Sequence, residues 1–144
     1  MTMTVLAVNP ILNVSDIAAT ISWFEKLGWT VGFEWHDDPT DSDSPVGFAS
    51  VKSGNHEIFL CRDGQGGRGK GSNTATFGTA GGETSDRGVW MSIWVDDLDV
   101  VHDRCVDADL EITHPPTTHA WGAREMHVRH PDGHVFRIST GAEI

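Results

Sequence analysis

The sequence predicts an α+β fold built from two consecutive βαβββ modules. Twice an apolar, β-rich run leads directly into a helix cap, as ILNVSDI near the amino end and as MSIWVDDL in the second half. The end of each predicted helix lies twelve positions after its cap, Gly28 after Asp16 and Asp109 after Asp97. Strand-like segments separated by turn residues follow both helices. The pattern is an internal duplication with a period of about eighty residues.

The first helix is predicted from its cap, its apolar spacing and its stop signal. Ser15 or Asp16 can accept hydrogen bonds from unpaired backbone N–H groups of the first turn, and the helix runs to Lys26. Gly28 follows as the stop, because glycine readily takes the left-handed conformation that ends many helices. The apolar run before the cap, residues 5–14, predicts a strand. Apolar residues recur at i, i+4, i+7 and i+10, namely Ile17, Ile21, Phe24 and Leu27.

Three strand-like segments complete the first module. They cover residues 29–35, 46–51 and 56–62, and residues 52–55 (KSGN) between the last two are a hairpin turn signal. Between the first two lies the acidic stretch HDDPTDSDSP, residues 36–45, which lacks the spacing and the glycine of an EF-hand loop. We interpret this stretch as a solvated loop.

The second module repeats the order. A strand is predicted over residues 89–95, and Asp96 or Asp97 caps a helix that carries Leu98, Val101 and Cys105. Three further strands are predicted over residues 110–113, 124–130 and 134–139.

The last two strands form a predicted hairpin whose register shows which side chains share a face. The segment 131–133 (PDG) is the turn signal. Pairing about it places three pairs on the core face: His130 with His134, Val128 with Phe136, and Met126 with Ile138. The opposite face is strongly polar, as in a sheet that lines a cavity or meets water, and carries Glu125, His127, Arg129, Val135 and Arg137.

Residues 64–88 hold nine glycines in twenty-five positions and connect the two halves. The stretch GQGGRGKGS nearly matches the phosphate-loop pattern GxxxxGK[ST], but Gly71 stands where the magnesium-binding hydroxyl is required and Ser72 comes one residue late. No helix pattern follows, so we predict a flexible linker or lid. The division is then one domain, 1–144, with modules at 5–62 and 89–140 and a connector at 63–88.

Composition and charge exclude several classes of function. The formal net charge of −11, with ten Lys and Arg spread along the chain, argues against a nucleic-acid partner. No apolar run approaches the ~20 residues of a membrane helix, and the amino end lacks the features of a signal peptide. We therefore expect a cytoplasmic protein without a membrane partner. Cys61 and Cys105 are then expected to be reduced thiols.

Two segments resemble the vicinal oxygen chelate superfamily, which includes glyoxalase I, extradiol dioxygenases and bleomycin resistance proteins. The stretch AVNPILNVSDIAATISWFEKLGW is similar to the entry strand and helix of the bleomycin resistance type. The stretch WGAREMHVRHPDGHVFRI is similar to its WGxRE segment and DPxG hairpin, with His130 in place of the usual Asp. The resemblance covers almost the whole chain. It implies a homodimer whose curved strands form ligand-binding cups at the interface.

The resemblance also places the metal ligands of the superfamily's enzymes. They come from the first and fourth strands of each module, which in this chain are Asn9, Phe59, Trp90 and Arg137. Phe and Trp offer no ligand atom, Asn is a weak oxygen donor, and Arg is a fixed cation. We therefore expect no metal and no other cofactor. A displaced metal site formed by His127, Glu125 and a residue such as Glu57 is the alternative.

Aromatic side chains are expected to line the cup instead. Strand alternation puts Trp90 and Trp94 on one face, whereas Trp23 on the helix is interpreted as core or dimer packing. Flat rings bind planar ligands by stacking, and the acidic net charge favours a cationic one. The predicted ligand-binding residues are Asn9, Trp35, Phe48, Phe59, Trp90, Trp94, Trp121, Glu125, His127 and Arg137.

The function predicted from the sequence is binding rather than catalysis. The chain is expected to be a metal-free, dimeric protein of the bleomycin resistance type that sequesters a planar or cationic antibiotic-like compound, with Glu125 paired to Arg137 or Arg124. One alternative is a glyoxalase-like lyase, isomerase or dioxygenase, with a displaced metal site or with His127 and Glu125 transferring protons. Another is an accessory protein of antibiotic biosynthesis that holds the producer's own product.

Overall fold

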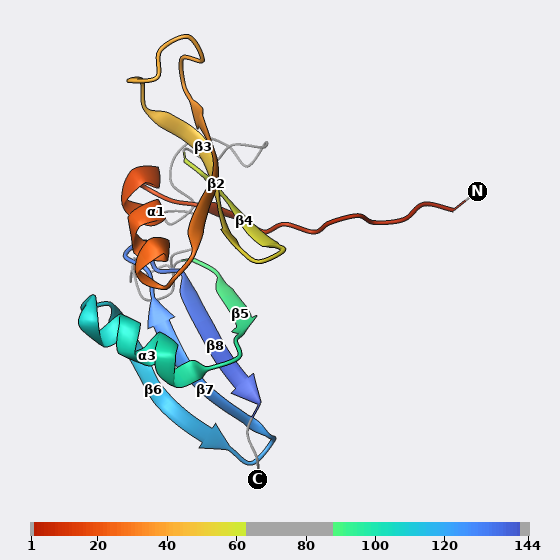
Figure 1. Cartoon of the computed structure of the whole chain (residues 1–144), viewed down its shortest axis with the longest axis vertical. Coiled ribbons are helices and arrows are strands. Elements are labelled where there is room, and N and C mark those ends of the chain that lie inside the picture. The colour runs from red at the N-terminus through yellow and green to blue at the C-terminus, as the bar shows by residue number, and fades with distance from the viewer. Residues whose placement is uncertain (1, 63–87, 142–144) are drawn as a thin grey trace, which may run out of the picture. The chain divides into compact units, whose positions relative to one another are not determined.

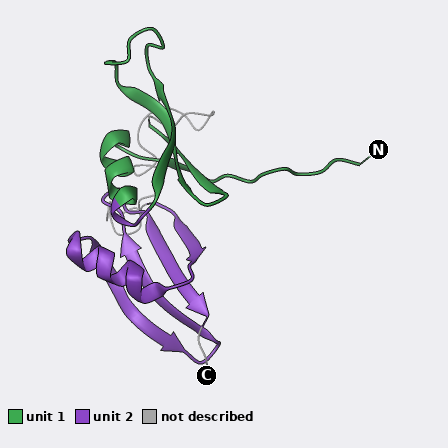
Figure 2. Ribbon diagram, in the orientation of Figure 1, with its two compact units in different colours: residues 1–25, 29–70 green, residues 26–28, 71–144 purple. Residues whose placement is uncertain are grey.

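The computed structural model describes residues 2–62 and 88–141, which form two compact units (Figures 1 and 2). In the described residues each unit holds one helix and one four-stranded sheet. The first contains β1 (Ile11–Asn13), α1 (Ile17–Lys26), β2 (Thr30–His36), β3 (Val46–Ser53) and β4 (His56–Cys61). The second contains β5 (Trp90–Trp94), α3 (Leu98–Asp107), β6 (Glu111–His119), β7 (Ala123–Arg129) and β8 (Val135–Gly141).

The two sheets have the same topology. The strand order is β1-β4-β3-β2 in the first and β5-β8-β7-β6 in the second. In both, the strand before the helix pairs in parallel with the last strand of the module, and the other neighbours are antiparallel. The α+β fold with two βαβββ modules is therefore confirmed.

The two helices begin and end in the same way. Asp16 accepts a hydrogen bond from the backbone of Ala19 at 3.0 Å, and Asp97 accepts from the first turn of α3. After α1, Gly28 has φ +98° and Trp29 donates to the carbonyl of Phe24 at 3.0 Å. After α3, Asp109 has φ 56° and Leu110 donates to the carbonyl of Cys105 at 2.9 Å. Both ends have the hydrogen bond of a Schellman motif.

One face of each sheet is buried and apolar, and the opposite face is called the open face below. In the first unit the buried residues include Leu12, Ile17, Ile21, Phe24, Val51, Ile58 and Leu60, together with Trp23 of α1. In the second they are Leu98, Cys105, Met126, Val128, Phe136 and Ile138. Val128 lies opposite Phe136 and Met126 opposite Ile138, so the predicted register of the last hairpin is confirmed.

The first strand is shorter than the sequence predicts. A strand is expected over 5–14, but β1 covers only three residues, so the prediction is wrong before Pro10. In the register of Ile11 with Phe59, Val8 would meet His56, the first residue of β4, so the residues before Val8 run past the end of the strand that they would pair with. The chain is extended there (Figure 1), and exposed apolar side chains follow it: Met3, Val5, Leu6 and Val8.

The strand β6 is longer than predicted. The sequence predicts a strand that ends at Thr113, and the observed strand continues through Pro115 and Pro116, which cannot donate to a sheet ladder. However, β6 lies at the edge of its sheet, where the missing donors can face away from the neighbouring strand. The register with β7 shifts on both sides of His114, which marks bulges in this strand.

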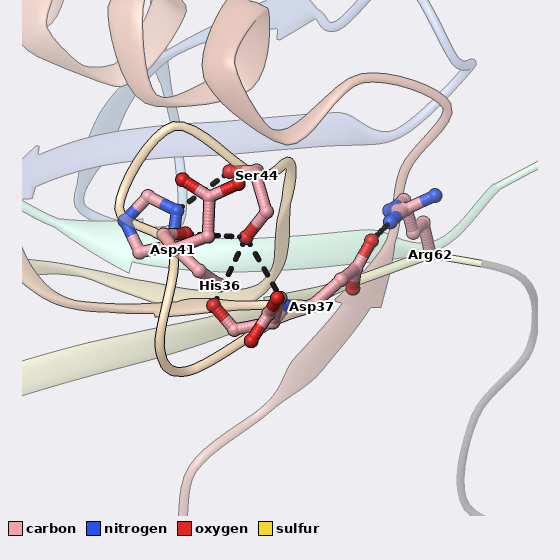
Figure 3. Close-up of polar contacts among 6 residues, drawn as sticks. His36, Asp37, Asp41, Ser44 and Arg62 are labelled. Atoms are coloured by element: carbon pink, nitrogen blue, oxygen red, sulfur yellow. Dashed lines mark hydrogen bonds and ion pairs between the residues drawn. The ribbon is translucent and has the colours of Figure 1, made fainter.

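The acidic loop between β2 and β3 is held by its own polar groups (Figure 3). Nδ1 of His36 lies 2.7 Å from the carbonyl oxygen of Ser44, and the Ser44 hydroxyl donates to the carbonyl oxygen of Asp41 at 2.7 Å. Asp37 pairs with Arg62, directly after β4. Most of the loop is exposed, in agreement with the prediction of a solvated loop.

The turn between β7 and β8 buries two histidines. His130 and His134 are joined by a backbone hydrogen bond of 2.8 Å, and the Nδ1 atoms of their rings accept hydrogen bonds from the backbone N–H groups of Asp132 and Val89. Gly133, at φ +93°, completes the turn. Burial lowers the pKa of His130 to about 4. Both imidazoles therefore serve the turn and the core.

Three other expectations concern single features. Cys61 and Cys105 are buried and are not joined in a disulfide, and burial raises the pKa of Cys105 to about 11. The glycine-rich connector, with its predicted linker or lid and its near match to a phosphate loop, lies outside the described residues. No helix in residues 2–62 and 88–141 is long and apolar enough to cross a membrane.

Candidate functional site

The open face of the first sheet carries a cluster of three phenylalanines. The rings of Phe33, Phe48 and Phe59 contact one another, and each pair of ring centroids lies 5.6 Å apart. Trp35 lies opposite Phe48 across β2 and β3 and is exposed. Phe33 is absent from the predicted site. Regular alternation could have found it, because Phe33 lies two positions before the predicted residue Trp35 and therefore shares its face.

The polar residues of the first open face are engaged with one another. The Ser50 hydroxyl donates to the Glu57 carboxylate and accepts from the backbone of Phe33 at 3.2 Å. The side-chain amide of Asn9 donates to the Glu57 carbonyl at 3.0 Å. A methyl group added to Gly32 would meet the Ser50 oxygen at 2.2 Å, so this glycine leaves the room for the hydroxyl. The side chain of Asn9, a predicted ligand-binding residue, is therefore bound to the backbone of β4.

The open face of the second sheet presents two large indoles. Along β5 the predicted alternation is observed: Trp90, Ser92 and Trp94 are exposed, whereas Met91 and Ile93 are partly covered. Trp90 and Trp94 are 67% and 63% exposed. Such large apolar groups on one strand face are available to a ligand or partner.

An ion pair lies beside these indoles. Glu125 on β7 accepts hydrogen bonds from Nε and Nη2 of Arg137 on β8, the second at 3.2 Å, so the predicted pairing with Arg137 is confirmed. Arg124, the other expected partner, pairs with Asp99 at 3.1 Å. The hydrogen bond from Arg137 holds the pKa of Glu125 below its usual value, and burial opposes that effect. Glu125 is thus held as a carboxylate.

Two histidines that the sequence analysis missed join this site from β6. Nε2 of His119 lies 2.9 Å from Oε1 of Glu125. His114 contacts His127, with ring centroids 4.8 Å apart. Their rings link a continuous row of five across the second sheet, which we call the aromatic row: Trp121, His119, His114, His127 and Trp90.

The aromatic row depends on the bulges in β6. His114 and His119 are five positions apart, so a regular strand would place them on opposite faces. The register shift between His114 and Thr117 inserts one extra residue at the Pro115-Pro116 pair and brings both rings to the open face. The stretch HPPTTH indicates that its two histidines share a face only when β6 is known to continue through the two prolines.

His127, a predicted site residue, lies at the centre of the row. Its ring meets Trp90 edge to face, with centroids 5.2 Å apart. Desolvation lowers the pKa of His127, and electrostatic interactions with His114 and Arg137 contribute in the same direction while Glu125 opposes them. Its Nε2 atom is buried and has no hydrogen-bond partner among the described residues. The ring is therefore kept neutral, with one nitrogen unused.

The second sheet does not have the arrangement of a metal centre. Its histidine rings stack face to face or tilt against one another, and Glu125 is already bound to Arg137. No group of three or more His, Cys, Asp or Glu in the described part of the chain could hold a metal ion. Glu57, considered with His127 and Glu125 as a displaced site, belongs to the first unit and accepts from Ser50 there.

Trp121 ends the aromatic row. Its indole stacks on His119 with centroids 4.1 Å apart and planes within 7°, and it is 65% exposed. The second unit therefore brings together Trp90, Trp94, Trp121, Glu125, His127 and Arg137 of the predicted set. The remaining predicted residues, Asn9, Trp35, Phe48 and Phe59, belong to the first unit.

Solved structures with the same fold include TioX, a bleomycin-binding protein and a bleomycin resistance determinant. TioX from Micromonospora sp. ML1 is 22% identical, with a TM-score of 0.65, and the match covers 96% of this chain and 98% of that one. A bleomycin-binding protein complexed with bleomycin is 17% identical, with a TM-score of 0.63 and coverage of 94% and 98%. A bleomycin resistance determinant encoded on the transposon Tn5 is 17% identical, with a TM-score of 0.64 and coverage of 96% and 98%.

These identities support the shared fold alone. No curated protein matches the chain. The family model described as Glyoxalase/Bleomycin resistance protein/Dioxygenase superfamily matches residues 5–138, and this family contains both enzymes and binding proteins. With two βαβββ modules and a match over almost its whole length, the chain belongs to the glyoxalase/bleomycin resistance protein/dioxygenase superfamily.

Proposed function

We propose that this chain is a metal-free binding protein that sequesters a planar, antibiotic-like small molecule on the open face of its second sheet. The observation that carries the proposal is the aromatic row, with Trp94 exposed beside it. Rings of this kind bind flat heteroaromatic ligands by stacking. Binding of bleomycin by a structurally similar protein supports the same class of function.

The strength of stacking indicates that the site needs a second wall. Each stacked ring contributes about 1 kcal/mol, whereas micromolar affinity requires about 8 kcal/mol. Contact with one open face therefore falls short, and a ligand that is covered on both sides gains much more. We propose that the second wall comes from another copy of the chain in a homodimer. A single cytoplasmic domain, 1–144, with modules 5–62 and 89–140 joined by 63–88, is part of this proposal.

The residues at the superfamily's metal positions support binding without a metal. Asn9 donates its amide to the backbone, Phe59 lies in an apolar cluster, Trp90 contacts His127, and Arg137 holds a carboxylate. Only Asn9 carries a possible oxygen ligand, and Arg137 would repel a divalent cation.

Titration followed by tryptophan fluorescence tests the proposal. Bleomycin, phenazine and quinoxaline compounds are added to the protein, and at least one is expected to change the emission at micromolar concentration. Trp90→Ala and Trp121→Ala each remove one end of the aromatic row and are expected to weaken binding about fivefold, the equivalent of one stacking contact. Absence of binding by all three classes would reject the proposal.

A second candidate function, a glyoxalase-like enzyme, rests on the contact between His119 and Glu125. Nε2 and Oε1 lie 2.9 Å apart, but Nε2 makes no hydrogen bond to a described residue in this geometry. The bond from Arg137 weakens this candidate, because a carboxylate with a lowered pKa is a poor base. Metal analysis of tag-free protein after incubation with iron, manganese, nickel and zinc separates the two: one retained equivalent per chain would favour the enzyme.

A further inference from the structure

The Glu125–Arg137 pair presents its positive end to the ligand side of the second sheet. The Glu125 side chain is 5% exposed and the Arg137 side chain 44% exposed, so the carboxylate lies beneath and the guanidinium lies above. The open face therefore has a cationic group at its surface, although the whole chain has a formal net charge of −11.

Half of the guanidinium remains available for a ligand. Glu125 takes Nε and Nη2, which form one edge of the planar group. Arginine has five N–H donors, so both donors of Nη1 and one of Nη2 are left. The edge formed by Nη1 and Nη2 can hold a second carboxylate through two parallel hydrogen bonds.

The position of Arg137 places this edge beside the indoles. In the register of β5 with β8, Arg137 lies directly opposite Ser92, between Trp90 and Trp94. Strand spacing and rise put each indole's backbone roughly 8 Å from that of Arg137. Ser92 is small, so it leaves the arginine side chain uncovered. A flat ring on either indole therefore has its edge near the guanidinium.

Two opposing effects determine whether the site prefers a cationic or an anionic ligand. The acidic chain attracts cations, and exposed indoles also bind cations. However, charges farther away than about 8 Å are largely screened at physiological salt, whereas Arg137 stands within that distance. His127 across the strand supplies no negative charge, and the only carboxylate that touches Arg137 in the described residues is buried. The exposed edge of the guanidinium, which a ligand can touch while the Glu125 carboxylate is covered, therefore decides the preference.

We infer that the ligand is a planar aromatic acid, and that Arg137 binds its carboxylate while the indoles of β5 and the aromatic row hold its rings. This inference rests on the proposed function, because it concerns the ligand of the same face. Arg137 is then the residue that determines specificity by charge.

Matched probes test the inference. Quinoxaline-2-carboxylate, quinoxaline-2-carboxamide and the N-methylphenazinium cation are titrated calorimetrically at neutral pH in 0.05 and 0.15 M salt. The carboxylate is expected to bind about tenfold more tightly than the carboxamide, and the cation most weakly, because a charge-assisted bidentate bond is formed only with the acid. Higher salt is expected to reduce the preference.

Variants distinguish a direct contact of Arg137 with the ligand from an effect of Arg137 on folding. Arg137→Gln is expected to lose the tenfold preference, whereas Glu125→Gln is expected to keep or increase it, because that change removes the competing carboxylate. Arg124→Gln is the control, since Arg124 pairs with Asp99 away from this site. Because Arg137→Gln leaves Glu125 buried without its cation, the double variant Glu125→Gln/Arg137→Gln is also measured, with circular dichroism to confirm folding.

Each outcome bears on one claim. Equal affinity for acid and amide, or a preference that survives in the double variant, would overturn the role of Arg137 and leave ligand binding intact. Tightest binding of the cation would reverse the charge preference. Failure of all three probes and of bleomycin would reject the proposed function and the inference with it.

Discussion

Phe48 and Phe59 occupy, in the first sheet, the positions that Glu125 and Arg137 occupy in the second. One pair belongs to an apolar cluster of three rings, and the other forms a half-buried ion pair. The same framework therefore supports opposite chemistry on its two open faces.

The register of the sheets establishes this equivalence. Ile11 pairs with Phe59, and Ser92 pairs with Arg137; each first-strand residue stands five positions before the aspartate that caps the helix. On the neighbouring strand, Phe59 pairs with Ser50, and Arg137 pairs with His127. Phe48 lies two positions before Ser50, and Glu125 lies two positions before His127.

The two modules share the features that determine their fold and differ in the side chains of their open faces. Caps, helix ends and strand order are repeated, because they determine the fold of each half. Open-face side chains are free to differ, since they contribute less to the core. A face of phenylalanines is suited to apolar contact, whereas a face with indoles, imidazoles and one exposed guanidinium is suited to selective binding.

The largest expected effect comes from transplanting the ion pair into the first sheet. Phe48→Glu and Phe59→Arg each place a charge among aromatic rings and lower the free energy of unfolding. The losses of the two single variants should add up to about 4 kcal/mol. In the double variant the two charges can pair as Glu125 and Arg137 do, so its loss should be at least about 1 kcal/mol smaller than the sum. Urea unfolding of the four proteins measures the coupling. Strict additivity would show that the positions are not equivalent.

Acid is expected to affect the two modules differently. Folding lowers the pKa of His130 from its ordinary value near 6.5 to about 4, because the ring is buried. The unfolded chain binds the proton first, so stability is fully present above pH 6.5 and is lost as the pH falls towards 4, by on the order of 3 kcal/mol. The matching turn of the first module, Gly54-Asn55, has no buried histidine.

The variant His130→Asn sharpens this test. An Asn side-chain oxygen can accept the hydrogen bond that Nδ1 of His130 accepts from Asp132. Thermal unfolding between pH 4 and 7 should therefore show a flatter pH dependence in the variant, whatever its absolute stability. An unchanged slope would assign the acid sensitivity to other groups.

The smallest expected effect concerns the helix ends. Gly28 and Asp109 occupy the same left-handed position, at φ +98° and φ 56°, but only glycine takes it without strain. Asp109→Gly also removes a negative charge from the carboxyl end of α3, so it should stabilise the protein by about 0.5–1 kcal/mol. Gly28→Ala should destabilise it by a similar amount. Denaturant midpoints compare the two changes.

The sequence predicts the features that local rules control. Both caps, Gly28 and the register of the last hairpin follow from residue types at fixed spacing, and the ion pair follows from that register. The aromatic row could not be predicted, because it depends on bulges at Pro115 that reverse alternation. The short β1 also escaped prediction, since the apolar residues before Val8 resemble a strand but lie beyond the first residue of β4, their pairing partner.

We propose that the open face of the second sheet holds the ligand. The six tryptophans allow a direct test, because each indole N–H gives its own NMR signal in protein labelled with ¹⁵N. With signals assigned by single Trp→Phe variants, saturating quinoxaline-2-carboxylate is expected to shift those of Trp90, Trp94 and Trp121 and to leave that of the buried Trp23 in place. A bound compound that leaves all three signals of the second unit unchanged would contradict the account.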